Sequence, residues 1–320
     1  MRTTTDTFLR TTTIQIIGDD VLRLRAVGAD AGGGSRVRAA TPDGAVALDV
    51  FVFEDAFTGG VRVATGDVTG DGVDDVLTAA GDGGGPRVRI LDGATGATVR
   101  DFFAFADTLR VGAFVAADDV NGDGFADYAV TAGLGGGSRV ALFDGKTGDR
   151  LGADFLAFDA ESRTGFTVAL GDVTGDGRPE IIVGQLGGGS KVRIFDLTGK
   201  LLSEFTAYEP TFAGGVFLSI GDADGNGSSE VILGAGPGGG PRVRAFVVAA
   251  DGALTEVQNG FSFDPNTRDG VKVGTSTNAT GQATVVAGLR GRTRLMVAGL
   301  NGIDDDAPFG PTWTGGLWVS

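Results

Sequence analysis

Four short stretches of the chain concentrate acidic residues at one repeated spacing. They read GDVTGDGVDD from residue 66, DDVNGDGFAD from 118, GDVTGDGRPE from 171 and GDADGNGSSE from 221. Each fits the pattern D-x-[DNT]-x-[DN]-G-x-x-[DE], with side-chain oxygens at loop positions 1, 3, 5 and 9 and glycine at position 6. Alternate groups then point inward while the glycine permits a sharp reversal, as in other calcium-binding loops. The chemistry that this spacing predicts is the binding of a hard cation by oxygen, Ca²⁺ above all.

The expected ligands are the side chains at positions 1, 3, 5 and 9 and the backbone carbonyl at position 7. For the first two loops they are Asp67, Thr69, Asp71, the Val73 carbonyl and Asp75, and then Asp119, Asn121, Asp123, the Phe125 carbonyl and Asp127. For the last two they are Asp172, Thr174, Asp176, the Arg178 carbonyl and Glu180, and then Asp222, Asp224, Asn226, the Ser228 carbonyl and Glu230. Asp74 and Asp118 fall at non-ligand positions, and we expect both to be solvated.

Charge repulsion within these loops supports a bound cation. Two carboxylates about 4 Å apart repel by about 4 kcal/mol at an effective dielectric near 20. No Lys or Arg stands at positions 1 to 6 of any loop, so side chains do not neutralise the acids locally. Four bound Ca²⁺ ions, with eight positive charges, would change the formal net charge from −15 to −7. We expect the bound ions to stabilise the fold rather than to act in signalling. The alternative to calcium binding is a set of solvent-exposed acidic hairpins without metal.

Composition excludes several classes of function. The net charge of −15 and the pI near 4.4 argue against nucleic acid, whose phosphates require clustered Lys and Arg. The chain has no Cys, so it has no disulfides and no thiolate metal sites. It has no His either, and so lacks the side chain that most often acts as a general base. No window reaches the roughly 18 apolar residues of a membrane span. The opening MRTTTDTFLR is not a secretory signal, so for an exported protein the signal lies outside this chain.

The acidic loops mark an internal repeat. Their first aspartates, Asp67, Asp119, Asp172 and Asp222, are 52, 53 and 50 residues apart, a period typical of propellers and other repeat arrays. Around the first loop, residues 59–67, 75–81, 87–93 and 97–105 alternate as four strands separated by turns. Four short antiparallel strands in about 50 residues form one propeller blade.

A glycine-rich turn counts the repeats. It reads AGGGSR at 31, DGGGPR at 82, LGGGSR at 134, LGGGSK at 186, PGGGPR at 237 and, in altered form, LRGRTR at 289. We interpret it as a geometric turn, because glycine accepts positive φ without steric cost. Basic residues follow it, namely Arg36, Arg87, Arg139, Lys191, Arg242 and Arg294. Ion pairs or hydrogen bonds from these basic residues to a neighbouring blade are favoured over an anion-binding site.

The two ends of the chain predict a closed ring. PFGPTWTGGLWVS (308–320) matches AYEPTFAGGVFLS (207–219), so the chain ends one strand into a new blade, while residues 21–58 offer the remaining three strands. Closure by this strand removes exposed sheet edges; RTTTIQII (10–17) is the competing candidate. The expected fold is all-β, a single six-bladed β-propeller domain over 1–320 with four-stranded antiparallel blades. Its expected segments are an N-terminal strap (1–20), repeats at about 21–58, 59–110, 111–163, 164–213, 214–269 and 270–314, and a closing strand (315–320).

The sequences GDVTGDGVDDVL, DDVNGDGFADYAV and GDVTGDGRPEIIV, each followed by a glycine-rich turn, resemble the FG-GAP/VCBS repeat family of integrin α-subunit propellers and bacterial surface proteins. The resemblance covers about residues 21–320. It implies a β-propeller that holds Ca²⁺ between the first and second strands of a blade. Two units depart from the motif: TSTNATGQAT (275–284) aligns Ser276, Asn278, Thr280 and Thr284 with ligand positions, and GDD (18–20) is short. We expect about four Ca²⁺ ions and no metal in those two units.

We expect a non-catalytic, calcium-binding extracellular module for adhesion or protein interaction, secreted or at the cell surface. It would be a monomeric propeller within a larger protein, with a protein or glycan ligand, no nucleic acid and no membrane insertion. One alternative is a glycan-binding propeller with sugar sites between blades, for which Trp313, Trp318, Tyr128 and Tyr208 are the exposed-aromatic candidates. A less favoured one is a polysaccharide lyase or hydrolase with a Tyr, Lys or Arg base. Phe102, Phe103, Phe105, Phe155 and Phe158 are expected to pack blade against blade.

Overall fold

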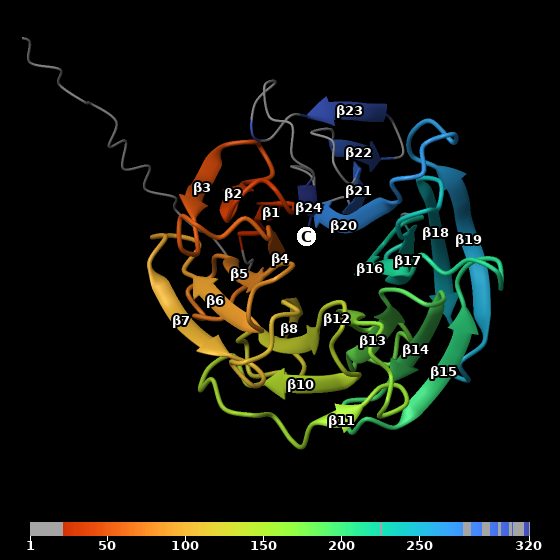
Figure 1. The fold of residues 1–320 in the computed structure, drawn as a ribbon, viewed down its shortest axis with the longest axis horizontal. Helices are drawn as coiled ribbons and strands as arrows, with labels where there is room; N and C mark the ends of the chain where they lie inside the picture. The colour runs from red at the N-terminus through yellow and green to blue at the C-terminus, as the bar shows by residue number, and fades with distance from the viewer. Residues whose placement is uncertain are drawn as a thin grey trace, which may run out of the picture.

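The fold is a ring of antiparallel sheets around a central axis, seen in a computed structural model (Figure 1). The structure describes residues 22–224, 226–277, 283–289, 295–299, 302–306, 309 and 317–319. Within these ranges all named elements are strands. None of the described residues belongs to a helix long and apolar enough to cross a membrane.

Each sheet has four strands, and consecutive strands pair as neighbours. The first blade joins β24 (Leu317–Val319), β1 (Arg25–Ala29), β2 (Arg36–Ala40) and β3 (Val46–Phe51); the second joins β4 (Val61–Gly66), β5 (Asp75–Ala80), β6 (Arg87–Leu91) and β7 (Thr98–Phe103). The third joins β8 (Ala113–Asp118), β9 (Asp127–Ala132), β10 (Arg139–Phe143) and β11 (Phe155–Leu156); the fourth joins β12 (Phe166–Gly171), β13 (Glu180–Gln185), β14 (Lys191–Phe195) and β15 (Leu201–Thr206). The fifth joins β16 (Val216–Gly221), β17 (Glu230–Ala235), β18 (Arg242–Val248) and β19 (Leu254–Phe261).

The predicted number of equivalent blades requires correction. In the five blades above, the turns between successive strands are described as well, apart from Gly225. A further sheet joins β20 (Val271–Thr277), β21 (Ala283–Leu289), β22 (Leu295–Gly299) and β23 (Gly302–Asp306), but its turns 278–282, 290–294 and 300–301 lie outside the described residues. The structure therefore shows five complete blades, not the predicted six. The sequence differs at this place too, because the acids of the loop are absent and the glycine-rich turn has become LRGRTR.

The C-terminal strand occupies the first-strand place of the first blade. β24 pairs antiparallel with β1, with Gly28 opposite Trp318 and Ala29 opposite Leu317. Figure 1 shows β24 beside β1 at the middle of the ring. Joining the two ends of the chain in one sheet covers an edge that would otherwise be open to pairing. The competing segment, 10–17, lies outside the described residues.

The hydrophobic core lies between neighbouring blades, because the second strand of a blade is buried on both faces. In β13, Ile181 packs toward the third blade, whereas its neighbour Ile182 packs toward the fifth. β5, β9 and β17 are likewise buried along their whole length. Successive strand side chains point to opposite faces, so an apolar run can serve two interfaces at once.

The innermost strands carry a matching set of side chains near the middle of the ring. At the same place in the first strands stand Trp318, Arg62, Phe114, Thr167, Phe217 and Lys272. The indole of Trp318 lies 5.3 Å from the ring centroids of both Phe114 and Phe217, and the Lys272 ammonium lies 3.8 Å from its centroid. The Trp318 Nε1–H donates to Asp30, which also pairs with Lys272 at 2.7 Å. Trp318 is thus a core residue of the ring rather than an exposed aromatic.

The described basic residues after the glycine-rich turns all have polar partners within their own blade, but only Arg87 and Arg242 also form the predicted ion pairs between blades, and Arg294 lies outside the described residues. Arg87 bonds Asp101 across β6 and β7, and its Nη1 bonds Glu54 of the first blade at 2.6 Å. Arg89 also pairs with Asp101 and donates to the Val52 carbonyl of the first blade. The same double role recurs in the fifth blade. These contacts favour the pairing interpretation over a ring of free cations.

Candidate metal centre

All four acidic loops share one backbone frame, built around the aspartate at position 1. In the first loop the Asp67 carboxylate accepts backbone N–H groups from Gly70 at 2.6 Å and Gly72 at 2.8 Å. Both glycines have positive φ, 71° and 84°, which non-glycine residues rarely adopt. The residue at position 5 accepts the N–H of position 7, as Asp71 does from Val73 at 2.9 Å. The aspartates at position 1 are Asp67, Asp119, Asp172 and Asp222.

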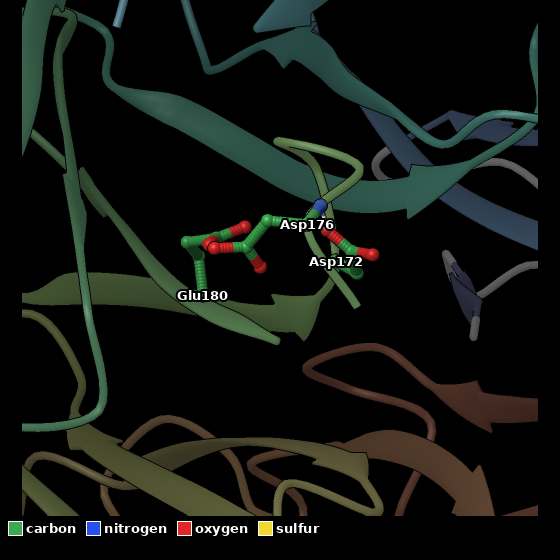
Figure 2. Close-up of side chains that lie close together, drawn as sticks. All are labelled: Asp172, Asp176 and Glu180. Carbon is green, nitrogen blue, oxygen red and sulfur yellow. Dashed lines mark hydrogen bonds between the residues drawn. The ribbon is translucent and has the colours of Figure 1, made fainter. Parts of the chain in front are cut away.

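Two of the loops, which end in glutamate, bring three carboxylates together. In the third loop, one oxygen from each of Asp172, Asp176 and Glu180 lies within 4.8 Å of the others, and in the fourth loop Asp222, Asp224 and Glu230 do the same. Figure 2 shows the side chains of the third-loop cluster gathered at the start of β13. Calcium–oxygen distances of about 2.3–2.6 Å place two ligands of one ion within about 5 Å of each other. Both clusters therefore match the spacing that a shared Ca²⁺ ion requires.

The glutamate of the fourth loop supplies the strongest indication of a missing partner. Glu230 is fully buried, and its Oε2 accepts the Ala223 N–H at 2.7 Å. Its Oε1 is buried without a hydrogen-bond partner among the described residues. Buried carboxylate oxygens are normally satisfied, because leaving one unpaired costs free energy. A cation between Glu230, Asp222 and Asp224 would satisfy this oxygen, so the residues present fit a calcium ion.

The other two loops end in aspartate, and that carboxylate is engaged differently. Asp75 Oδ2 accepts the N–H groups of Val68 and Thr69 at 2.8 Å each, while its Oδ1 accepts the Gly93 N–H at 3.0 Å. Asp127 repeats the last contact with Gly145 at 2.8 Å. Each aspartate therefore connects the acidic loop to the turn after the third strand. Among the described residues, these two loops do not form a cluster of three carboxylates like those of the third and fourth loops.

The residue at the head of that turn explains the difference. The aligned segments read RVRILDG, RVALFDG, KVRIFDL and RVRAFVV, so Gly93 and Gly145 correspond to Leu197 and Val248. A Cβ on Gly93 would lie 1.8 Å from the Asp74 carbonyl oxygen, so only glycine lets this turn come close enough for its N–H to reach Asp75. In the other two blades a side chain stands there, and the longer glutamate turns its second oxygen into the loop.

Burial raises the pKa of the carboxyl at position 9 in all four loops. For Asp75 and Asp127 the pKa rises to about 6, although backbone N–H bonds act to lower it. Burial also raises the pKa of Glu180 and Glu230, and the charges of neighbouring acids add to this effect. Removing a carboxylate from water disfavours its charged form, and a nearby cation reverses that preference.

The remaining predicted ligands lie within the loop frame, without a test of their coordination. Thr174 Oγ1 donates to Glu180 at 3.1 Å, and Thr69 Oγ1 lies 3.5 Å from Asp67. Asn121 and Asp224 each accept the N–H of position 5. The metal-ligand roles of the loop side chains and of the Val73, Phe125, Arg178 and Ser228 carbonyls all stay predictions. The expected metal-free unit at 275–284 lies partly outside the described residues, and residues 18–20 lie wholly outside them.

The expectation that Asp74 is solvated was wrong. Asp74 is 2% exposed, accepts the Leu24 N–H at 2.9 Å and pairs with Arg23 at 3.3 Å. It holds the segment before β1 against the first acidic loop, where Leu22 also bonds the Gly72 carbonyl. Asp118 is half-buried and accepts the Asp119 N–H, and burial raises its pKa. A residue beside a loop can thus be buried by a segment from another blade.

Sequence reasoning missed the Gly93 and Gly145 N–H donors. The signal was present in the alignment of the third strands, where glycine accompanies a final aspartate and a larger residue accompanies a final glutamate. The exposed aromatic residues also differ from those expected. Tyr128 and Tyr208 are buried, and Trp313 lies outside the described residues. Phe103, expected to pack between blades, is instead 46% exposed.

Part of the chain matches a known family model. Residues 119–183 match the family model of the FG-GAP-like repeat, a segment that runs from the second acidic loop through the third. The match and the propeller fold together support the resemblance found in the sequence.

Solved structures with some similarity include two lyases and a propeller domain. Rhamnogalacturonan lyase YesW is 15% identical over 94% of this chain and 69% of its own, with a TM-score of 0.42. The exotype rhamnogalacturonan lyase YesX is 16% identical over 89% of this chain, with a TM-score of 0.43, and the match spans 60% of the YesX chain. The β-propeller domain of Myceliophteria thermophila Cps50 (Swd1) is 14% identical over 92% of this chain and 87% of its own, with a TM-score of 0.49. At these identities and TM-scores the likeness carries no information on what this chain binds or catalyses.

Proposed function

We propose that this FG-GAP repeat propeller is a non-catalytic calcium-binding module that serves as an extracellular surface for adhesion or protein interaction. The observation that carries the calcium role is the buried, unpartnered Oε1 of Glu230 beside Asp222 and Asp224. The equivalent cluster in the third loop supports it. Ca²⁺ would neutralise the acids and join the first two strands of a blade, which is a bracing role.

The non-catalytic role is supported by repetition. The acids of the four loops occupy equivalent places in successive blades, and a residue that recurs in several blades is weak support for one unique active site. The chain also has no His and no Cys. Fold alone does not determine function, so the binding role rests on the site and on the family match. An extracellular setting would supply the millimolar Ca²⁺ that such loops commonly need.

Removal of the metal tests this proposal. We expect the melting temperature to rise from EGTA to millimolar Ca²⁺, with the increase spread over about 10⁻⁴–10⁻³ M, the usual range of extracellular calcium modules. Mg²⁺ at the same concentration is the control, because it demands a smaller octahedral site. A melting temperature that changes with neither Ca²⁺ nor EGTA, in protein shown by metal analysis to hold no calcium, would refute the calcium role.

A further inference from the structure

Two equivalent hollows lie over the glycine-rich turns of the second and fifth blades. The first has a volume of about 330 Å³ and the second about 250 Å³. Most of their lining residues correspond, among them Glu54, Arg87, Phe103 and Arg110 in one and Glu209, Arg242, Phe261 and Arg268 in the other. The same pocket has thus been built twice in one ring, far apart in sequence.

The glycines form a floor between two phenyl rings. A Cβ on Gly84 would lie 3.0 Å from the Phe57 ring, and one on Gly85 would lie 2.7 Å from the Phe103 ring. In the fifth blade the corresponding distances are 3.0 Å from Gly239 to Phe212 and 2.9 Å from Gly240 to Phe261. Any side chain at these turns would displace the rings. Phe103 and Phe261 remain 46% and 55% exposed, so each hollow presents an aromatic face to solvent.

An arginine held by its own loop stands at the edge of each hollow. Arg110 Nη1 donates to the carbonyls of Asp107 and Leu109, and Arg268 Nη1 donates to those of Pro265 and Thr267. Neither guanidinium forms an ion pair within the part of the chain that the structure describes. Each guanidinium is therefore oriented through one nitrogen, Nη1. Five donors in a fixed fork make such a group a specific hydrogen-bonding element.

A carboxylate complements this donor. Glu54 lines the second-blade hollow with a 69% exposed side chain and bonds Arg87 at 2.6 Å, and Glu209 does the same with Arg242 at 2.8 Å. Each hollow therefore offers a group that only donates, a carboxylate that only accepts and an apolar ring. A pyranose ring has hydroxyls that both donate and accept, and C–H groups whose partial positive charge favours an aromatic face.

We propose that the hollows over the second and fifth blades are two equivalent binding sites for a neutral pyranose. The C–H face of the sugar packs on Phe103 or Phe261, and its hydroxyls bond Arg110 and Glu54 or Arg268 and Glu209. A neutral sugar is favoured over an acidic one because Glu54 or Glu209 lines each hollow and the chain carries a net charge of −15. This inference rests on the proposed binding role, for which it names the ligand class.

The sequence provides a matched control within the same ring. In each hollow, a phenylalanine from the loop that enters the blade is combined with an arginine from the loop that leaves it. The two pairs are Phe57 with Arg110 and Phe212 with Arg268. Arg163 has the same backbone contacts as Arg110, to the Ala160 and Ser162 carbonyls, but the loop one blade earlier carries Leu109 in the place of Phe57 or Phe212. Arg163→Gln therefore removes an equivalent charge without touching either site.

Saturation-transfer NMR with the full chain and a panel of neutral methyl pyranosides tests the inference, with methyl glucuronide as the acidic comparison. We expect at least one neutral pyranoside to bind with two sites per chain by calorimetry. Arg110→Gln with Arg268→Gln, and separately Phe103→Ala with Phe261→Ala, should weaken binding at least tenfold. Arg163→Gln should bind like the wild type, and melting curves confirm that each variant is folded.

Three results would overturn it: no neutral pyranoside binds, methyl glucuronide binds instead of the neutral sugars, or Arg163→Gln weakens binding as much as the paired substitutions do. Repeating the titration in EGTA separates this inference from the calcium proposal. If the sugar binds but the melting temperature does not change with Ca²⁺, only the calcium role is refuted. A calcium-dependent melting temperature with no sugar binding would refute the sugar sites alone.

Discussion

The first two acidic loops and the last two share a backbone frame but engage their final acid in opposite directions. Asp75 and Asp127 reach outward to the N–H of a glycine in the following turn, at 3.0 and 2.8 Å. Glu180 and Glu230 direct an oxygen inward, where three carboxylates lie within 4.8 Å of one another. A single methylene, together with the residue at the head of a distant turn, thus separates a loop whose final acid is bound by that turn from a loop whose three carboxylates converge.

The difference shows that one repeat can stabilise its loop in two ways. In the second and third blades, backbone N–H donors satisfy the final carboxylate, so these loops keep their form without a cation. In the fourth and fifth blades, Leu197 and Val248 stand where the turn glycines of the other two blades do, and burial, together with the neighbouring acids, raises the pKa of Glu180 and Glu230. The account therefore predicts that calcium contributes most to the third and fourth loops.

The largest effect is expected from Gly93→Ala. The new Cβ would lie 1.8 Å from the Asp74 carbonyl oxygen, so the turn must move and Asp75 must lose its N–H partner. We expect a loss of about 3 kcal/mol in the free energy of unfolding, measured by urea denaturation. Gly83→Ala tests positive φ without a close contact and should cost less. A loss for Gly93→Ala no larger than that of Gly83→Ala would break the proposed link between turn and loop.

A smaller effect, visible in the presence of calcium, is expected from Glu230→Gln. The substitution keeps the side chain's shape but removes the charge that a cation needs. At free Ca²⁺ one hundred times the Kd, binding at one site stabilises the fold by about 2.7 kcal/mol, and this increment should be lost from thermal melts. In EGTA the variant should melt close to the wild type.

Asp75→Asn is the matched comparison for Glu230→Gln. Its amide replaces one acceptor oxygen with a donor, so it should cost about 1–3 kcal/mol with or without calcium, because buried N–H groups lose their acceptor. A loss for Asp75→Asn that vanishes in EGTA would show that the two kinds of loop bind calcium alike.

Much of the fold and of the loop frame was predictable from the sequence because both depend on local patterns. The strands follow period-2 runs, and the loop hydrogen bonds of Asp67 and Asp71 join residues at most five positions apart. The strand at Leu317–Val319 was recognisable because LWVS repeats the start of an earlier blade. The blade count failed where the pattern itself decays, at residues 275–294.

The features that escaped prediction depend on segments from other parts of the chain. Asp74 is buried by Arg23 and Leu24, about fifty residues away, through contacts that its own loop does not encode. The partner of Asp75 is a backbone N–H, which no side-chain motif reveals.

Anomalous diffraction from crystals grown at about 10⁻⁴ M Ca²⁺, within the range of extracellular calcium sites, tests the central claim site by site. The account predicts calcium peaks in the 172–180 and 222–230 loops, next to Glu180 and Glu230, at higher occupancy than any peak in the 67–75 and 119–127 loops. Equal or higher occupancy in the aspartate-ended loops, or no calcium beside Glu230 even at millimolar Ca²⁺, would contradict it.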